Sequence, residues 1–140
     1  MSTTVSTRGS EISTATLQAP RLVPAVLSGA RMHIDCPRWC VVDHAADPGA
    51  LIEDLSHESD YVDLEASIVN KPDGLQLFAR LGLDPLSADP WRQQPFLLID
   101  GGSGPDDLTL DAADEFADSL VGFAAQIREL ARAARDGGAQ

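Results

Sequence analysis

Hydrophobic and polar residues alternate in two neighbouring stretches in the middle of the chain. Residues 61–69 read YVDLEASIV and residues 75–81 read LQLFARL, so every second side chain in each stretch is hydrophobic. A period of two is typical of a strand with one buried face. The residues between them, NKPDG at 70–74, favour a tight turn. The two stretches therefore predict a β-hairpin.

A third strand is predicted further along the chain. Residues 96–99, FLLI, are continuously hydrophobic, as expected of a central strand that is covered on both faces. The segment DGGSGP at 100–105 ends this strand, and a loop rich in Pro and Asp, residues 82–95, precedes it.

The last part of the chain predicts one long helix over residues 107–136. Its hydrophobic residues recur at steps of three and four, which aligns them on one face. They are Leu108, Ala112, Phe116, Leu120, Phe123, Ile127, Leu130 and Ala134. Thr109 is the expected N-cap, and Gly137 suits the C-terminal end. Acidic residues gather near the beginning and arginines near the end, so the charges complement the helix dipole.

These elements predict an α+β fold. We expect a three-stranded antiparallel sheet within residues 61–100, with the long C-terminal helix packed on it. A loop that resembles a zinc knuckle, residues 29–60, precedes the sheet, and a single domain spans residues 29–136. Residues 1–28 are rich in Ser, Thr, Ala and Pro and follow neither period, so we expect a disordered N-terminal tail.

The charge of the chain narrows its expected partners and location. Twenty-two acidic residues against ten basic ones give a formal net charge of −12, which opposes binding to the phosphates of nucleic acids. Neither a signal peptide nor a run of 18 hydrophobic residues is visible, so we expect a cytoplasmic protein that binds no membrane. Cytoplasmic thiols are normally reduced, which favours metal or redox chemistry over a structural disulfide.

Candidate metal ligands are concentrated in one part of the chain. Both cysteines and all three histidines fall within residues 33–57. Cys36, Cys40, His44 and His57 form a C-x3-C-x3-H-x12-H pattern, and His33 lies just upstream. Zinc binds thiolate sulfur and imidazole nitrogen, commonly four in a tetrahedron with two local cysteines. The pattern therefore predicts a zinc site, although its histidine spacing differs from that of standard zinc fingers.

Two local structures would bring the first three ligands together. Cys36, Cys40 and His44 could lie on one face of a short helix that begins at Pro37, since they are four residues apart. A hairpin-like knuckle would converge them equally well. In both cases His57 comes from a later segment and closes the site.

Two other interpretations of these residues remain open. The cysteines could form a redox pair, although C-x3-C differs from the usual C-x-x-C. Alternatively, the thiols and histidines share no function. Within the metal interpretation, we expect Trp39 to pack over the knuckle and Asp43 to orient an imidazole from outside the ligand set.

The motif also resembles a known family. C-P-x-W-C-x-x-D-H at 36–44, His-Glu-Ser at 57–59 and L-T-x-x-x-A at 108–113 are together similar to small uncharacterised proteins of actinomycetes such as Streptomyces, over residues 34–135. The resemblance implies that Cys36, Cys40, His44 and His57 are the shared positions and that His33 is not a ligand. It implies no established activity.

We therefore expect a small, non-enzymatic module that is held together by zinc and serves an interaction or regulatory role with an unknown protein partner. A closed site with four protein ligands leaves no position for a substrate water. One alternative is a metal-dependent hydrolase with an open site and with Asp43 or Glu58 as its base. Another is a metal-free acidic scaffold that mimics the charge of nucleic acid.

Overall fold

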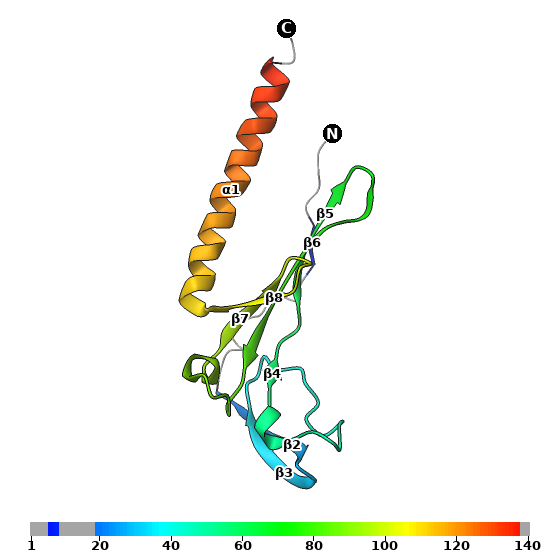
Figure 1. The fold of residues 1–140 in the computed structure, drawn as a ribbon, viewed down its shortest axis with the longest axis vertical. Helices are drawn as coiled ribbons and strands as arrows, with labels where there is room; N and C mark the ends of the chain where they lie inside the picture. Colours follow the sequence, from blue (N-terminus) through cyan, green and yellow to red (C-terminus); the bar gives the residue numbers. More distant parts are fainter. Residues whose placement is uncertain (1–5, 9–18, 138–140) are drawn as a thin grey trace. The chain divides into compact units, whose positions relative to one another are not determined.

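The computed structural model describes residues 6–8 and 19–137 of the 140-residue chain. The chain divides into two compact units, residues 1–108 and 109–140. Within the described residues, the first unit is built from two antiparallel sheets and the second from one long helix (Figure 1).

The larger sheet has six strands among the described residues, in the order β1-β5-β6-β7-β8, and β4 also pairs with β6. Two short 3-10 helices, η2 and η3, lie in the connecting loops. The bounds of these elements are β1 (Ser6–Arg8), η2 (Ile52–Asp54), β4 (His57–Glu58), β5 (Val62–Ile68), β6 (Lys71–Leu83), η3 (Pro90–Gln93), β7 (Phe96–Asp100) and β8 (Pro105–Thr109).

The three predicted strands correspond to β5, β6 and β7, which pair consecutively and antiparallel. The α+β class is confirmed, but the prediction of one three-stranded sheet is wrong, because β1, β4 and β8 extend that sheet and a second sheet exists. The extra strands are two to five residues long. Strands this short carry too few positions for a period of two to be recognised.

The turn between β5 and β6 is tighter than expected. Ile68 pairs with Lys71, so the connection consists of Val69 and Asn70 alone. Asn70 has a φ of 64°, a left-handed conformation that asparagine tolerates better than most residues. The segment 71–74, predicted as part of the turn, is therefore the beginning of β6.

The second sheet is a hairpin of β2 (Arg21–Leu27) and β3 (Ala30–Cys36). Its two-residue turn, Ser28 and Gly29, has positive φ at both positions, as type I′ hairpin turns require. The prediction of a disordered tail is thus wrong for residues 6–8 and 21–27, which form the strands β1 and β2. The rest of that prediction falls largely on residues 1–5 and 9–18, outside the described part of the chain.

Few side chains of the described residues are fully buried. The buried hydrophobic residues are Ala25, Leu27, Cys36, Cys40 and Phe96, and the buried polar residues are His44, His57 and Ser59. Half of these eight residues are the predicted metal ligands. The core of the first unit therefore depends on the Cys/His residues as much as on aliphatic side chains.

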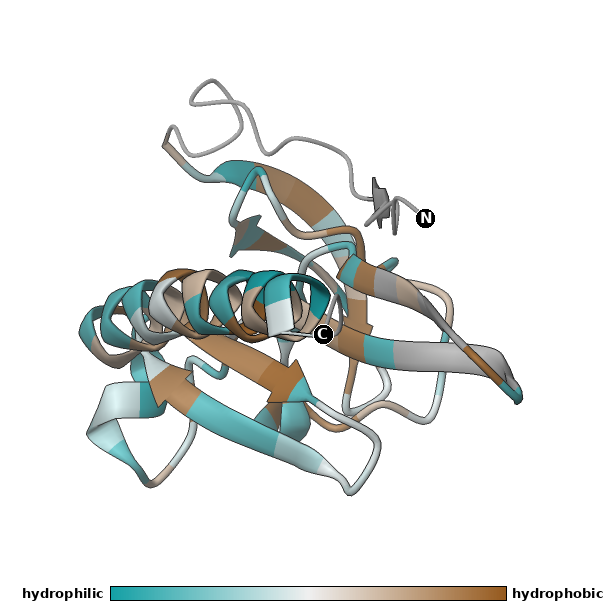
Figure 2. Cartoon of the chain, turned by 90° about the horizontal axis from the view of Figure 1, so that it is seen from above, coloured by the Kyte–Doolittle hydropathy of each residue, from teal (hydrophilic) through white to brown (hydrophobic). Residues whose placement is uncertain are grey.

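The second unit is the helix α1 (Leu110–Gly137). The predicted N-cap is confirmed, because the Ala112 N–H donates a hydrogen bond to the Thr109 Oγ1 at 3.2 Å. Figure 2 shows that the helix carries both hydrophobic and hydrophilic residues along its length, and none of its described residues is buried. Its packing on a sheet stays a prediction.

Candidate metal centre

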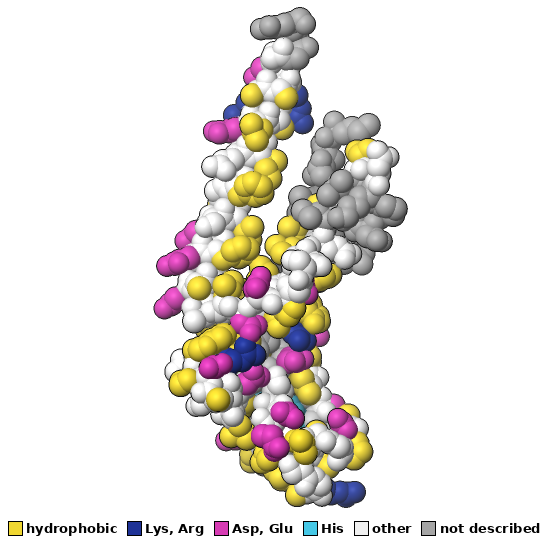
Figure 3. Space-filling model, viewed as in Figure 1, with side chains coloured by type: hydrophobic (Ala, Val, Ile, Leu, Met, Phe, Trp, Pro, Cys, Tyr) yellow, Lys and Arg dark blue, Asp and Glu magenta, His cyan; other side chains and the backbone are white. Residues whose placement is uncertain are grey.

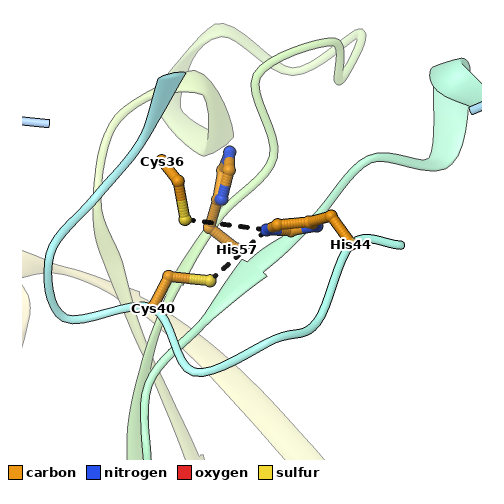
Figure 4. Close-up of side chains that lie close together, drawn as sticks. All are labelled: Cys36, Cys40, His44 and His57. Carbon is orange, nitrogen blue, oxygen red and sulfur yellow. Dashed lines mark hydrogen bonds between the residues drawn. The ribbon is translucent and has the colours of Figure 1, made fainter. Parts of the chain in front are cut away.

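Three successive pieces of chain and one distant strand supply the four predicted ligands. Cys36 is the last residue of β3, and a turn closed by the Cys40 N–H donating to the Pro37 carbonyl at 3.0 Å brings Cys40 back beside it. His44 follows in the next loop, and His57 begins β4. Figure 4 shows the four side chains pointing toward one another.

Backbone hydrogen bonds attach the ligand-bearing loop to the strands on both sides of it. The Val41 N–H donates to the Glu58 carbonyl at 2.9 Å, which ties the chain after Cys40 to β4. The Val26 N–H of β2 donates to the His44 carbonyl at 3.0 Å. The positions of the ligands are thus fixed by the backbone as well as by their own contacts.

The distances between the donor atoms suit one small cation. One potential ligand atom from each of Cys36, Cys40, His44 and His57 lies within 4.8 Å of the others. The His44 Nε2 is 3.7 Å from the Cys36 Sγ and 3.6 Å from the Cys40 Sγ. Sulfur and nitrogen bound to one tetrahedral zinc ion at about 2.3 and 2.0 Å lie about 3.5 Å apart. The arrangement is therefore compatible with a metal site.

Burial of the four side chains adds a second argument. Their exposed fractions are 1% for Cys36, 2% for Cys40, 8% for His44 and 1% for His57. Buried polar atoms normally have hydrogen-bond partners, because their desolvation is otherwise uncompensated. Among the described residues the buried His57 Nδ1 has no such partner. A metal ion bound at this nitrogen would satisfy it.

The protonation of the site follows from its burial. Burial and the neighbouring Cys40 raise the pKa of the Cys36 thiol to about 11. Burial and the nearby His44 lower the pKa of His57 to about 4, against an opposing effect of Asp84. Burial likewise lowers the pKa of His44. The imidazoles are therefore neutral and able to donate electron pairs, and a bound cation would favour the thiolate form of the cysteines.

The structure decides between the two local arrangements predicted for the first ligands. Cys36 ends a strand, and the residues up to Cys40 form a turn. The predicted short helix beginning at Pro37 is therefore absent, and the ligands converge through the hairpin-like knuckle. His33 is exposed on β3, where it pairs with Pro24 of β2, and it is not in the Cys/His cluster.

Two acidic residues considered as bases have other contacts. The exposed Asp43 accepts a hydrogen bond from the Ala45 N–H at 3.0 Å, and its charge opposes the lowering of the His44 pKa. Glu58 forms an ion pair with Arg80 at 2.8 Å. Trp39 is partly buried, and its packing over the knuckle stays a prediction.

Sequence reasoning missed the role of Ser59, which is 4% exposed. Its hydroxyl accepts a hydrogen bond from the Leu81 N–H and donates one to the Asp60 carbonyl, both at 2.8 Å. The Ser59 N–H in turn donates to the Leu81 carbonyl at 3.0 Å. These bonds fix the chain beside His57 against β6. The His-Glu-Ser motif at 57–59 was the signal that could have drawn attention to Ser59.

Comparison with known families assigns the chain to one of them. A family model described as a domain of unknown function (DUF6907) matches residues 6–136, and the chain belongs to that family. Searches of curated proteins and of solved structures each found no match. Of the helices in the described residues, none combines the length and hydrophobicity needed to cross a bilayer. The actinobacterial origin of the chain stays a prediction.

Proposed function

We propose that this protein is a small, non-enzymatic module in which a zinc ion bound by Cys36, Cys40, His44 and His57 holds the fold together for an interaction or regulatory role. The observation that carries the proposal is the convergence of four buried donors, within 4.8 Å of one another, from separate parts of the chain. Two sulfurs and two nitrogens are a ligand set typical of structural zinc.

The choice of a structural over a catalytic role rests on the number of ligands. Catalytic zinc usually has three protein ligands and one open position, whereas four protein ligands complete a tetrahedron. The ion pair with Arg80 further reduces the suitability of Glu58 as a base. A metal-dependent hydrolase would need one of the four side chains to leave the metal.

A specific feature keeps that hydrolase as the second candidate. A cavity of about 450 Å³ adjoins the cluster, and His44, Asp43 and Glu58 are among its lining residues. If His44 left the metal, the vacant position would face this cavity.

The net charge of −12 supports a third candidate function, a metal-free acidic scaffold. The reduced thiols that zinc requires agree with a cytoplasmic location.

The decisive experiment measures metal in protein purified without a histidine tag. We expect about one equivalent of zinc per chain, by elemental analysis and native mass spectrometry, and loss of structure on chelation. Less than about 0.3 equivalents, together with an unchanged fold in a chelator, would contradict the zinc proposal and favour the metal-free scaffold.

A pair of histidine variants tests the ligand set. His57→Ala removes a donor that is 1% exposed and should weaken zinc binding at least about tenfold, as measured by competition with a chromophoric chelator. His33→Ala, from an exposed position on β3, is the matched control and should leave the affinity unchanged. Equal affinities for the two variants would remove His57 from the ligand set.

A further inference from the structure

Two cavities beside the metal centre adjoin each other. Asp54, Leu55, Ser56 and Glu58 line a cavity of about 350 Å³, and the same four residues line the cavity of about 450 Å³ next to the Cys/His cluster. We call the two cavities together the knuckle groove. Every residue that lines it belongs to the first unit, so the groove is defined without reference to α1. Each volume lies within the range of about 300–1,000 Å³ that is typical of binding clefts.

Part of the groove lining is hydrophobic. The buried side chains of Leu27 and Phe96 line it, together with Val42 and Leu51, which are 37% and 47% exposed. A hydrophobic surface thus extends from buried positions out to the solvent. Such a surface with a polar border is typical of sites that bind another protein.

Carboxylates form the polar part of the lining. The groove has six acidic lining residues, of which Glu58 and Asp84 form ion pairs with Arg80 and Arg92 at 2.8 Å. The other four are exposed, and among the described residues none of them forms an ion pair. They are Asp43, Asp47, Glu53 and Asp54. Figure 3 shows acidic side chains lying among hydrophobic ones on the first unit.

We propose that the knuckle groove binds an extended segment of a partner protein in which basic and hydrophobic residues alternate. The inference rests on the proposed zinc-held interaction module and names the chemistry of its partner. Successive side chains of an extended segment point to opposite sides. Hydrophobic side chains would contact Leu27 and Leu51, and long basic side chains would reach the exposed carboxylates. The net charge of −12 attracts a basic partner from a distance.

The metal centre would control the shape of the groove. The segment 45–56, which supplies much of the lining, lies between the predicted ligands His44 and His57. The Ser28 N–H donates a hydrogen bond to the Ala50 carbonyl at 2.8 Å and so ties the middle of this segment to the β2–β3 turn. Zinc bound by both histidines would fix its two ends. We therefore expect removal of the metal to weaken binding of the partner.

Binding of a labelled peptide to the full-length, zinc-loaded protein tests the proposal. The probe has eight residues, arginine alternating with leucine, and its fluorescence anisotropy reports binding. We expect a dissociation constant below about 100 µM. The double variant Asp47→Asn with Asp54→Asn should weaken binding at least about tenfold. Asparagine keeps an oxygen that can accept the Gly49 N–H, which bonds to the Asp47 Oδ1 at 2.9 Å.

A matched control separates the groove from the overall charge. Asp35→Asn with Asp60→Asn changes the net charge equally, at exposed positions that line neither cavity. This control should change the affinity less than about twofold, because exposed charges far from the peptide are screened by salt. Equal losses of affinity in the two double variants would overturn the proposal, since charge alone would then attract the peptide.

The hydrophobic contribution is tested without any change of charge. Leu51→Ser should weaken binding about fivefold, because it removes a hydrophobic side chain from the groove lining. A second peptide, with serine in place of each leucine, should bind at least about tenfold more weakly than the first. Equal affinities for the two peptides would overturn the hydrophobic part of the site.

Metal content distinguishes failure of this inference from failure of the zinc proposal. A folded protein with one zinc ion that does not bind the first peptide at about 1 mM would overturn the partner chemistry and leave the zinc proposal intact. Unchanged affinity in a chelator would overturn the control of the groove by the metal. A chain without zinc that still binds through Asp47 and Asp54 would support the groove and contradict the zinc proposal.

Discussion

The Cys/His cluster and the helix α1 reverse the usual relation between hydrophobicity and burial. In the cluster, polar and titratable side chains are at most 8% exposed, whereas on α1 hydrophobic side chains such as Phe123 and Leu130 are more than half exposed. The burial of these polar side chains therefore indicates a binding partner for their donor atoms, because the loss of solvation is unfavourable unless a partner replaces the water. On the helix, hydrophobic side chains are exposed because a single helix has no interior in which to bury them.

The two regions also differ in what stabilises them. The first unit has few buried hydrophobic side chains among its described residues, so a bound metal is expected to supply much of its stability. The second unit is one capped helix of 28 residues. An isolated helix is marginal in water and depends on propensity, capping and partners.

The largest expected effect is a loss of structure around the cluster that leaves the helix α1 unchanged. The double variant Cys36→Ser with Cys40→Ser removes two ligands, and we expect it to lose zinc and the structure of residues 21–60. Structural zinc contributes about 10–16 kcal/mol in small domains, which matches or exceeds the total stability of about 5–15 kcal/mol of most domains. Hydrogen exchange should therefore rise throughout that segment.

In the same experiment α1 serves as the internal reference. Its amides should exchange at the wild-type rate, since none of its described residues is buried. A segment 21–60 that keeps its protection without the two thiols would show that the fold there does not need a metal.

The next effect is the opposite response of two glycines to the same substitution. A Cβ at Gly82 of β6 would lie 2.6 Å from the Phe96 Cζ, so Gly82→Ala should destabilise the first unit by about 1–3 kcal/mol. A Cβ at Gly122 of α1 meets nothing within 4 Å. Gly122→Ala should therefore stabilise the helix by about 0.5–1 kcal/mol. Denaturation monitored by the two tryptophans and by helical circular dichroism would distinguish the two results, and a neutral Gly82→Ala would contradict the tight packing of Phe96.

A smaller effect is expected at the beginning of the helix. Thr109→Ala removes the acceptor for the Ala112 N–H and should cost about 1 kcal/mol of helix stability. Thr109→Ser keeps a hydroxyl and is the matched control. Zinc affinity should be the same for both variants, and a weaker affinity in Thr109→Ala would mean that the two regions are coupled.

The smallest effect is expected at the remaining histidine. His33→Ala alters an exposed side chain outside the Cys/His cluster, so its free energy of unfolding should change by less than about 0.5 kcal/mol. A chelation curve that differs from wild type would bring His33 into the site and change the boundary between the two regions.

Long periodic segments could be predicted from the sequence. The strands now seen as β5, β6 and β7 and the helix with its Thr109 cap followed from hydrophobic spacing and capping chemistry. The grouping of Cys36, Cys40, His44 and His57 followed from the few residue types that bind soft metals. In each case the signal lay in residues close together in the sequence or unusual in kind.

The remaining features depend on contacts that local patterns do not encode. The hairpin of β2 and β3 was missed because Pro24 interrupts its first strand, and proline usually argues against a strand interior. The Ser28–Gly29 turn was the overlooked signal. β4 is two residues long, and it is defined by pairing with β6 rather than by its own sequence. Ser59 acquires its role only through Leu81, twenty-two residues away.

The loop that carries His44 has one more consequence, which concerns protein quality control. It accepts the Val26 N–H through the His44 carbonyl and the Ser28 N–H through the Ala50 carbonyl, so it covers the edge of β2 that β3 does not. A free strand edge is a template for pairing with other chains. If the proposed zinc ion holds this loop in place, we expect its removal to release the loop and expose that edge, so that metal-free chains aggregate more readily than metal-bound ones.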